Sequence, residues 1–263
     1  MPVPARIEGL LLDIDGVLTV SWDPLPGASD AVQWLRTSRL PFRLLTNTTT
    51  YGRTTLAELL SDAGLGVAPE EIVTAAVSTA EFLRREHAGE RCFLLGQPEL
   101  EEDFAGVEFV EDDAGVVVVA GADDAFTWGN LNRALMMLRS GAQLVAMHRN
   151  VTWTTAEGLK LDAGAFLLGL EAASGVEATV IGKPNREFFL QAVGLLGLEP
   201  GAVAMVGDDA ESDVAAAQRA GLTGILVRTG KFAPQDVERA SMKPHHSIDS
   251  VGDLPALVER LRS

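Results

Sequence analysis

Two aspartates stand two positions apart in Asp13-Ile14-Asp15-Gly16, directly after an apolar run. A strand that gives way to a glycine turn would present both carboxylates at one end of that strand. Clustered carboxylates repel each other unless they share a cation, and a hard divalent ion with oxygen ligands meets that need. Magnesium suits the pattern better than calcium, because one or two carboxylates, waters and a substrate phosphate complete its shell. A simple turn held by aspartate side-chain hydrogen bonds is the alternative.

Polar residues also follow three later apolar runs. They are Thr46-Asn47, Gly182-Lys183-Pro184, and Gly207-Asp208-Asp209 with Asp213 five residues past Asp208. Lys183 supplies the positive charge that a phosphoryl group requires, and Thr46 with Asn47 offers hydrogen-bond donors. Each segment alone has an ordinary explanation, as a helix cap or as a turn with a solvated lysine. Together they predict a site for a cation and a phosphoryl group.

Such a set of side chains can catalyse phosphoryl transfer in two steps. One carboxylate can attack phosphorus and form an aspartyl-phosphate. A second carboxylate can protonate the departing alcohol and then activate water, provided that its surroundings raise its pKa.

The apolar runs that precede these residues alternate with amphipathic stretches along the chain. Strands are expected at residues 7–13, 42–46, 91–95, 116–120, 143–147, 178–181, 203–206 and 224–227, and helices at 28–38, 54–63, 131–140, 187–196 and 212–220. Apolar runs without alternation are typical of strands covered on both faces. Ligands of open parallel sheets gather beyond the carboxyl ends of the strands, which is where the polar residues fall. The sequence therefore predicts an α/β protein with a doubly wound parallel sheet.

Composition places the chain among ordinary globular proteins. Of its 263 residues, 47% are apolar and 22% are charged, which argues against disordered and fibrous classes. The 21 basic and 37 acidic residues give a net charge of −16, so nucleic acid and anionic membrane surfaces are not expected partners. The apolar runs are too short to span a membrane, and Glu8 and Asp13 interrupt the first one, so no signal peptide is predicted.

The remaining candidate residues have simpler explanations. Cys92 is the only cysteine, which excludes an intramolecular disulfide and a multi-cysteine zinc site; it is expected to be a small buried strand residue in a cytoplasmic protein. The histidines show no metal-binding spacing. The acidic stretch at 99–113 is predicted to be a solvated loop. Residues 224–231 contain glycines and a lysine, but their spacing does not fit a Walker phosphate loop.

The four polar segments resemble the four motifs of the haloacid dehalogenase superfamily of phosphohydrolases. Residues 13–18, Asp-Ile-Asp-Gly-Val-Leu, look like the first motif, Thr46-Asn47 like the second, Lys183 like the third and residues 207–213 like the fourth. Residues 26–28 and 45–50 are similar to the NagD-like branch, which contains p-nitrophenyl phosphatases and pyridoxal phosphatase. The likeness covers nearly the whole chain.

The resemblance implies catalytic and metal-binding roles for five aspartates. Asp13 would be the nucleophile and a Mg²⁺ ligand, and Asp15 would be the general acid/base that also binds the metal through its backbone carbonyl. Asp208 would complete the metal site, while Asp209 and Asp213 would ligate through water or orient the ligands.

The resemblance also implies how the chain handles its substrate. Thr46, Asn47 and Lys183 would hold the transferring phosphoryl group. A Rossmann-like core would be formed by residues 1–77 and 178–263, with a large α/β cap inserted at residues 78–177. A helix at residues 162–174 and the segment before it match the part of the cap that shapes the leaving-group pocket, and Asn150 is the expected substrate contact there. The family further suggests a homodimer formed through the cap.

The sequence thus predicts a magnesium-dependent phosphatase that acts on a small phosphorylated molecule through an aspartyl-phosphate on Asp13. Sugar phosphates, nucleotides, pyridoxal phosphate, pyrophosphate and phosphoamino acids all remain as substrates. Two alternatives stay open: a non-catalytic or regulatory module that binds phosphate and magnesium, and a phosphotransferase of the same superfamily.

Overall fold

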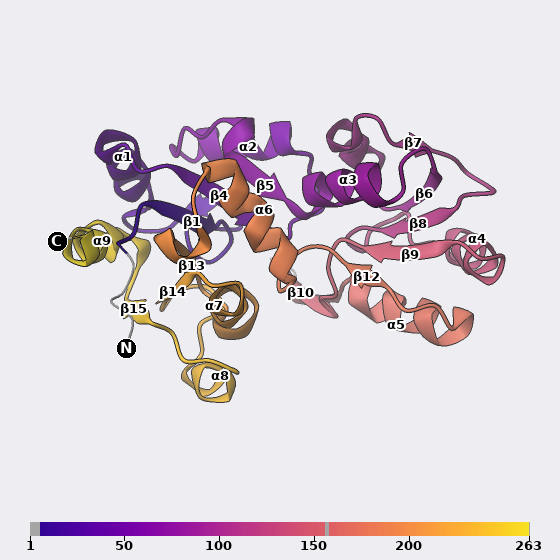
Figure 1. Ribbon diagram of the computed structural model, residues 1–263. Coiled ribbons are helices and arrows are strands. Elements are labelled where there is room, and N and C mark those ends of the chain that lie inside the picture. The colour runs from indigo at the N-terminus through magenta and orange to yellow at the C-terminus, as the bar shows by residue number, and fades with distance from the viewer. Residues whose placement is uncertain (1–5, 156–157, 263) are drawn as a thin grey trace. The chain divides into compact units, whose positions relative to one another are not determined.

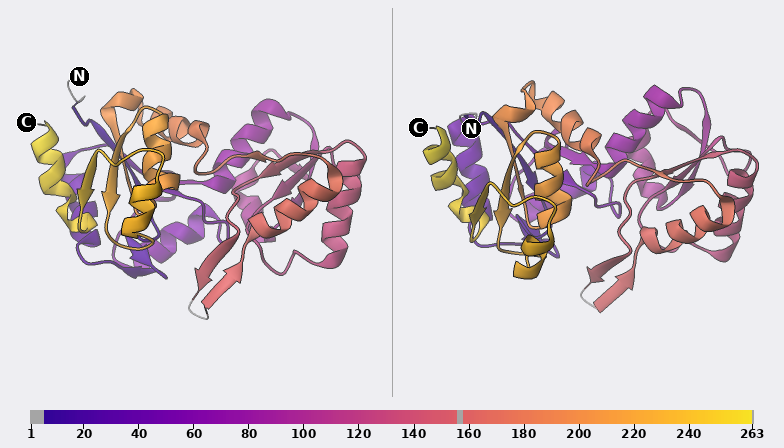
Figure 2. Two further views of the ribbon diagram at one scale, coloured as in Figure 1. Left: turned by 90° about the horizontal axis from the view of Figure 1, so that it is seen from below. Right: turned by 60° about the horizontal axis from the view of Figure 1, so that its bottom comes forward.

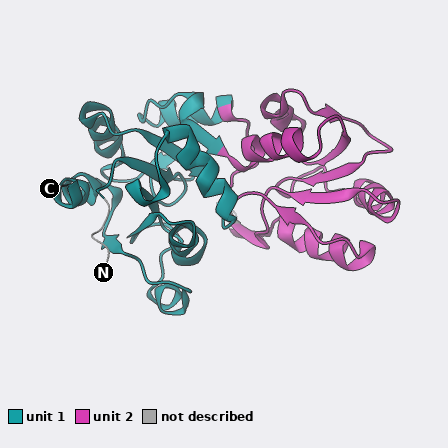
Figure 3. Ribbon diagram, in the orientation of Figure 1, with its two compact units in different colours: residues 1–46, 54–73, 183–263 teal, residues 47–53, 74–182 magenta. Residues whose placement is uncertain are grey.

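The computed structural model describes residues 6–155 and 158–262. The chain divides into two compact units, one formed by residues 1–46, 54–73 and 183–263 and the other by residues 47–53 and 74–182 (Figure 3). Each unit contains a parallel sheet with helices packed against it (Figure 1). The α/β class with a doubly wound parallel sheet, predicted from the apolar runs, is confirmed.

The first unit is built on a six-stranded sheet in the order β15-β14-β13-β1-β4-β5. Its strands are β1 (Gly9–Asp13), β4 (Phe42–Thr46), β5 (Ile72–Thr74), β13 (Val203–Gly207), β14 (Thr223–Val227) and β15 (His246–Ile248). β1 pairs in parallel with both β13 and β4, so that Leu12 lies opposite Val206 and Leu44. The chain adds strands β4 and β5 on one side of β1 and strands β13, β14 and β15 on the other side. In such sheets ligands bind at the carboxyl ends of the strands where the order reverses, which here is the end of β1.

Helices cover both faces of this sheet. They are α1 (Ala28–Ser38), α2 (Arg53–Asp62), α6 (Arg186–Leu196), α7 (Ala216–Arg219), α8 (Pro234–Arg239) and α9 (Leu254–Arg262), with short 3₁₀ turns at Pro69–Glu71, Pro200–Ala202 and Val251–Asp253. Leu10 and Leu12 pack in one core with α1, α2 and α9, whereas Leu11 packs in another with α6 and α7. Successive side chains of a strand point to opposite faces, so a strand buried on both sides is apolar throughout.

The second unit repeats this architecture on a five-stranded sheet in the order β12-β9-β8-β6-β7, with all four pairings parallel. The strands are β6 (Arg91–Leu95), β7 (Glu108–Phe109), β8 (Val116–Val119), β9 (Gln143–Ala146) and β12 (Thr179–Val180). Helix α3 (Ala75–Glu86) packs with Val116 and Val118 on one face. Helices α4 (Trp128–Arg139) and α5 (Ala163–Ser174) pack with Val117 and Val119 on the other.

Two small antiparallel pairs complete the fold. Strands β2 (Thr19–Val20) and β3 (Asp23–Pro24) follow the first motif, and strands β10 (Thr152–Thr155) and β11 (Gly158–Leu161) form a hairpin that extends from the second unit (Figure 2). Among the described residues, no helix is long and apolar enough to cross a membrane.

Three of the segments expected from the sequence differ in the structure. The stretch at 99–113 is not simply a solvated loop, because a 3₁₀ helix, Pro98–Phe104, buries Leu100 and Phe104 against the sheet of the second unit. The helix expected at 131–140 begins three residues earlier, because the Thr127 hydroxyl caps it by accepting from the backbone N–H of Asn130. The helix expected at 212–220 is a π-helical turn, Ala210–Ala215, followed by the short α7.

Candidate active site

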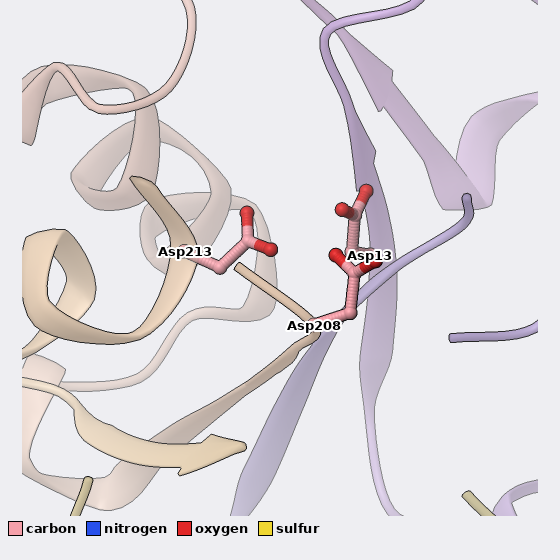
Figure 4. Close-up of side chains that lie close together, drawn as sticks. All are labelled: Asp13, Asp208 and Asp213. Carbon is pink, nitrogen blue, oxygen red and sulfur yellow. The ribbon is translucent and has the colours of Figure 1, made fainter. Parts of the chain in front are cut away.

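Three carboxylates from separate segments converge in the first unit. Asp13 is the last residue of β1, and Asp208 directly follows β13, the neighbouring parallel strand. Asp213 belongs to the π-helical turn that comes after Asp208. One oxygen from each carboxylate lies within 4.8 Å of the others, and all three residues are buried (Figure 4). The ends of two neighbouring parallel strands thus bring Asp13 and Asp208 together, and the turn after β13 adds Asp213.

Lys183 joins two members of this cluster. Its Nζ atom lies 2.8 Å from Asp13 Oδ1 and 2.8 Å from Asp213 Oδ1, and the side chain is only 5% exposed. Burial by itself lowers the pKa of Lys183, but the negative charges of Asp13 and Asp213 outweigh burial and raise this pKa above its ordinary value. Lys183 therefore stays charged between Asp13 and Asp213.

The surroundings of Asp208 favour its protonated form in the absence of a cation. Burial, followed by the charges of Asp13 and Asp213, raises the pKa of Asp208 to about 8. The backbone N–H of Lys231 donates to Asp208 Oδ2 at 2.7 Å, which acts in the opposite direction. Burial is also the main cause that raises the pKa of Asp213 above its ordinary value, against the lowering effect of Lys183.

The site fits a hard divalent cation. Asp208 Oδ1 is buried and has no hydrogen-bond partner among the residues that the structure describes. A buried carboxylate oxygen without a partner is unfavourable, and two further carboxylates stand beside it. Oxygen ligands from Asp13, Asp208 and Asp213 are the donor set that Mg²⁺ and Ca²⁺ prefer.

The turn after β1 carries the second aspartate of the first motif. Gly16 has φ +81°, a backbone conformation that favours glycine, and its N–H donates to the carbonyl oxygen of Thr19 at 2.7 Å. This turn keeps Asp15, which is half-buried, next to the end of the strand that bears Asp13. Within the described residues, the carboxylate of Asp15 is not one of the three that cluster.

Asp209 has a structural role in the same region. Its Oδ1 atom accepts hydrogen bonds from the backbone N–H groups of Glu211 (3.0 Å) and Ser212 (2.8 Å), so that it caps the π-helical turn. Its own N–H donates to Asp213 Oδ2 at 3.2 Å. Asp209 thus orients the turn that presents Asp213 to the cluster.

The remaining predicted residues lie in different units. Thr46 ends β4 in the first unit and is buried. Asn47, the next residue, belongs to the second unit and lies against Gly182. A Cβ atom added to Gly182 would lie only 2.4 Å from Asn47 Oδ1. Asn150 is exposed in the second unit, and its carbonyl oxygen accepts from the N–H of Gly164 at 2.8 Å. Among the described residues, the carboxylate cluster consists of Asp13, Asp208 and Asp213, and Lys183 pairs with two of them.

Two neighbours of Asn150 are engaged within the second unit. His148 is buried, with Nε2 3.4 Å from the Thr49 hydroxyl and Nδ1 accepting from the N–H of Asn150. Arg149 makes two hydrogen bonds with Glu171, of 2.8 Å and 2.6 Å. Both side chains hold the loop after β9 in place.

Comparison with known proteins reveals relatives along nearly the full length of the chain. It is 34% identical to haloacid dehalogenase-like hydrolase domain-containing protein 2 from Bos taurus over 95% of both chains. The chain belongs to the haloacid dehalogenase-like hydrolase family. The family model described as "Haloacid dehalogenase-like hydrolase" matches residues 10–110, and the one described as "HAD-hyrolase-like" matches residues 180–254.

Further relatives place the protein in the NagD-like branch of this family, as the motifs predicted. Phospholysine phosphohistidine inorganic pyrophosphate phosphatase from Homo sapiens is 32% identical over 95% of this chain and 93% of the relative. The structure of a 4-nitrophenylphosphatase from Thermotoga maritima matches with a TM-score of 0.91 and 31% identity, covering 98% of this chain and all of that one. NagD from E. coli K-12 matches with a TM-score of 0.87 and 28% identity over 94% of this chain and 98% of its own. The predicted enzyme class, a phosphoric monoester hydrolase, is confirmed.

Sequence reasoning did not identify the loop at residues 229–231, which follows β14. It contacts both Asp208 and Gly16 through backbone and hydroxyl groups. Residues 224–231 were compared with a Walker phosphate loop, which their spacing does not fit, and were assigned no role in the site.

Proposed function

We propose that this hydrolase is a magnesium-dependent phosphatase that cleaves a small phosphorylated molecule through an aspartyl-phosphate on Asp13. The observation that supports the proposal is the convergence of Asp13, Asp208 and Asp213 with Lys183 at the carboxyl edge of a parallel sheet. A binding module would need the cation and the anion sites, but it would not need a nucleophile beside a second carboxylate, Asp15, in the adjoining turn.

The charges of the cluster explain why a cation is required. When all three carboxylates are ionised, they and the one ammonium carry a net charge of minus two in a buried site, which would repel a phosphate dianion. We assign Asp13, Asp208 and the backbone carbonyl of Asp15 as the Mg²⁺ ligands, and Asp209 and Asp213 as residues that would ligate through water or orient these ligands. When bound, the ion neutralises charge on the oxygens of the transferring phosphoryl group.

The first chemical step uses Asp13 and Asp15. A carboxylate oxygen of Asp13 attacks phosphorus, and the bond from phosphorus to the leaving oxygen breaks. Asp15 donates its proton to that oxygen, and the product alcohol departs. Lys183 keeps the Asp13 carboxylate aligned and offsets negative charge as the bond forms, because its ammonium is fixed between Asp13 and Asp213.

The second step returns the enzyme to its starting state. Asp15, now ionised, accepts a proton from a water molecule whose oxygen attacks phosphorus. The bond between phosphorus and Asp13 breaks, the carboxylate is restored, and inorganic phosphate leaves. Thr46, Asn47 and Lys183 hold the phosphoryl oxygens through both steps.

The second unit is proposed to act as the cap that determines which phosphorylated molecule is accepted. Residues 78–177 lie within it, and Asn150 is assigned as a contact to the leaving group. The same unit exposes Leu159 and Leu161 on strand β11 and Leu168 on α5, with exposed fractions of 71%, 60% and 53%. Such a group of exposed leucines is typical of an interface, and we propose that it joins two copies of the chain. A reducing compartment such as the cytoplasm suits the one free, buried thiol, Cys92.

A turnover assay on p-nitrophenyl phosphate tests the proposed reaction. We expect hydrolysis that requires Mg²⁺ and is abolished by Asp13→Asn and by Asp15→Asn, whereas Asp30→Asn on the exposed face of α1 leaves the rate unchanged. Brief acid quenching of the wild type should trap phosphate on Asp13. Mg²⁺ binding without turnover of any phosphoester would identify a regulatory module instead. Transfer of the phosphoryl group to an added alcohol in preference to water would identify a phosphotransferase.

A further inference from the structure

The loop at residues 229–231, which joins β14 to the segment before α8, makes three contacts with the first and fourth motifs. We infer that this loop is a positioning element that fixes Asp208 and the Asp15-Gly16 turn relative to each other. The inference rests on the proposed function, since it presumes that Asp208 binds the cation.

The first contact selects which oxygen of Asp208 is available. The backbone N–H of Lys231 donates to Asp208 Oδ2 at 2.7 Å, whereas Oδ1 is buried without a hydrogen-bond partner among the described residues. Because β13 and β14 pair in parallel, with Gly207 opposite Leu226, the loop after β14 emerges beside Asp208. The amide of Lys231 thus holds the Asp208 carboxylate in one orientation and leaves Oδ1 for the cation.

The second contact reaches the first motif. The hydroxyl of Thr229 donates a short hydrogen bond to the carbonyl oxygen of Gly16, the residue after Asp15. Two residues of one loop therefore bind the aspartate of the fourth motif and the turn that carries the proposed general acid.

The third contact is a close approach of backbones that excludes any side chain. A Cβ atom added to Gly230 would lie 2.1 Å from Asp208 Oδ2 and 2.4 Å from the Cα atom of Gly16. A Cβ atom on Gly16 would lie 1.9 Å from the same oxygen of Asp208. Gly230 also has φ +59°, in the left-handed region. Three segments meet here at distances that glycine alone permits, so that a displacement of the loop must displace Asp208.

These contacts make a specific prediction about the Lys231 side chain. The hydrogen bond to Asp208 comes from the backbone, so Lys231→Ala retains it. Groups that hydrogen-bond to metal ligands typically change metal affinity by about 10- to 100-fold when they are removed. We therefore expect positioning to depend on Gly230 and Thr229 and not on the ammonium at position 231.

Binding of Mg²⁺ alone, measured by titration calorimetry without substrate, tests the inference. We expect Gly230→Ala to weaken Mg²⁺ binding about 10- to 100-fold relative to the wild type. Gly66→Ala is the matched control, since Gly66 has nearly the same φ (+55°) in the same unit but open space around its missing Cβ atom. Equal Mg²⁺ affinity in the two variants would overturn the inference.

A second pair of variants keeps the test decisive if Gly230→Ala does not fold. Thr229→Val removes the hydroxyl at nearly constant volume, and Thr229→Ser retains it. We expect Thr229→Val to weaken Mg²⁺ binding about 10-fold and to lower kcat with little change in KM, and Thr229→Ser to restore both. If Mg²⁺ affinity falls in both Thr229 variants, or in neither of them, the inference is contradicted. Failure of the wild type to bind Mg²⁺ would overturn the proposed function together with it, whereas wild-type binding with an unaffected Gly230→Ala variant would overturn only the positioning role.

Discussion

The ammonium of Lys183 lies 2.8 Å from a carboxylate oxygen of Asp213, the same distance as from Asp13. Asp213 comes from the π-helical turn, 30 residues after Lys183 in the chain. The lysine therefore ties the proposed nucleophile to a turn of the fourth motif, and it does more than provide charge for a substrate. Each of the three side chains is buried, so none of the charges is stabilised by bulk water.

Replacing Lys183 with methionine should damage both stability and activity. Two buried carboxylates would lose their shared partner, and breaking a buried ion pair typically costs about 3–5 kcal/mol. We expect the free energy of unfolding in urea to fall by that amount, and kcat/KM on p-nitrophenyl phosphate to fall by about 10²–10³-fold. Lys243→Met serves as the control, because Lys243 is an exposed lysine of the same unit whose ammonium donates to the carbonyl oxygens of Val237 and Glu238 and, among the described residues, pairs with no carboxylate. If Lys183→Met has the same free energy of unfolding and the same kcat/KM as this control, the ion pairs of Lys183 contribute to neither stability nor catalysis.

Asp209 offers a test that separates a helix cap from a ligand of the cation. Because its carboxylate accepts from the N–H groups of Glu211 and Ser212, Asp209→Ala should lower the free energy of unfolding by about 1 kcal/mol. Serine is also a good cap, so Asp209→Ser should recover most of the stability and most of the Mg²⁺ affinity. If serine restores stability but not Mg²⁺ affinity, the carboxylate acts on the cation and not only on the turn.

The sequence was sufficient to predict where Asp13 and Asp208 meet, because each comes directly after an uninterrupted run of apolar strand residues. Parallel strands with this pattern must be covered on both faces, and their carboxyl ends share one edge of the sheet. The pairing of Asp213 with Lys183 could not be predicted in the same way, since it depends on a π-helical turn where a regular helix was expected.

Other features escaped prediction for a different physical reason. The amide of Lys231 that binds Asp208 is a backbone group that every residue except proline possesses, so the residue type carries no signal for it. Nor does residue type reveal that Thr46 and Asn47, which are adjacent in the second motif, belong to different compact units. Asn47 lies against Gly182, which is far away in the sequence but in the same unit.

The exposed leucines of the second unit predict an effect on oligomeric state. Leu161 on β11 and Leu168 on α5 are 60% and 53% exposed, and a charge at both positions should prevent two copies from packing there. We expect the wild type to be a dimer by light scattering and the Leu161→Glu, Leu168→Glu double variant to be a monomer with unchanged thermal stability. Leu195→Glu, at a leucine of α6 that is 52% exposed in the first unit, should remain a dimer. A monomeric wild type would contradict the proposal.

The pKa of Asp208 predicts how stability depends on pH when no metal is bound. Its pKa of about 8 in the folded protein lies above the ordinary value of 3.8, so the folded state binds a proton that the unfolded state has released. This contribution is fully present at low pH and is lost as the pH rises through 8. Between about pH 3.8 and pH 8 the free energy of unfolding should therefore fall by about 1 kcal/mol for each unit by which the pH rises.

Two measurements on the chelator-treated protein check this expectation. Tm should decrease between pH 6.5 and pH 8.5, and Asp208→Asn, which cannot ionise, should reduce the decrease. Burial also raises the pKa of Asp213, so Asp213 contributes in the same direction. The Arg36-paired Glu71 and the Arg149-paired Glu171 have lowered pKa values and are fully ionised throughout this range, so they do not contribute to the slope. Added Mg²⁺ should raise Tm more at pH 8.5 than at pH 6.5, because the ion must displace the Asp208 proton at the lower pH. A Tm of the metal-free protein that rises with pH, or a Mg²⁺ effect that is larger at pH 6.5, would contradict the electrostatic description of this site.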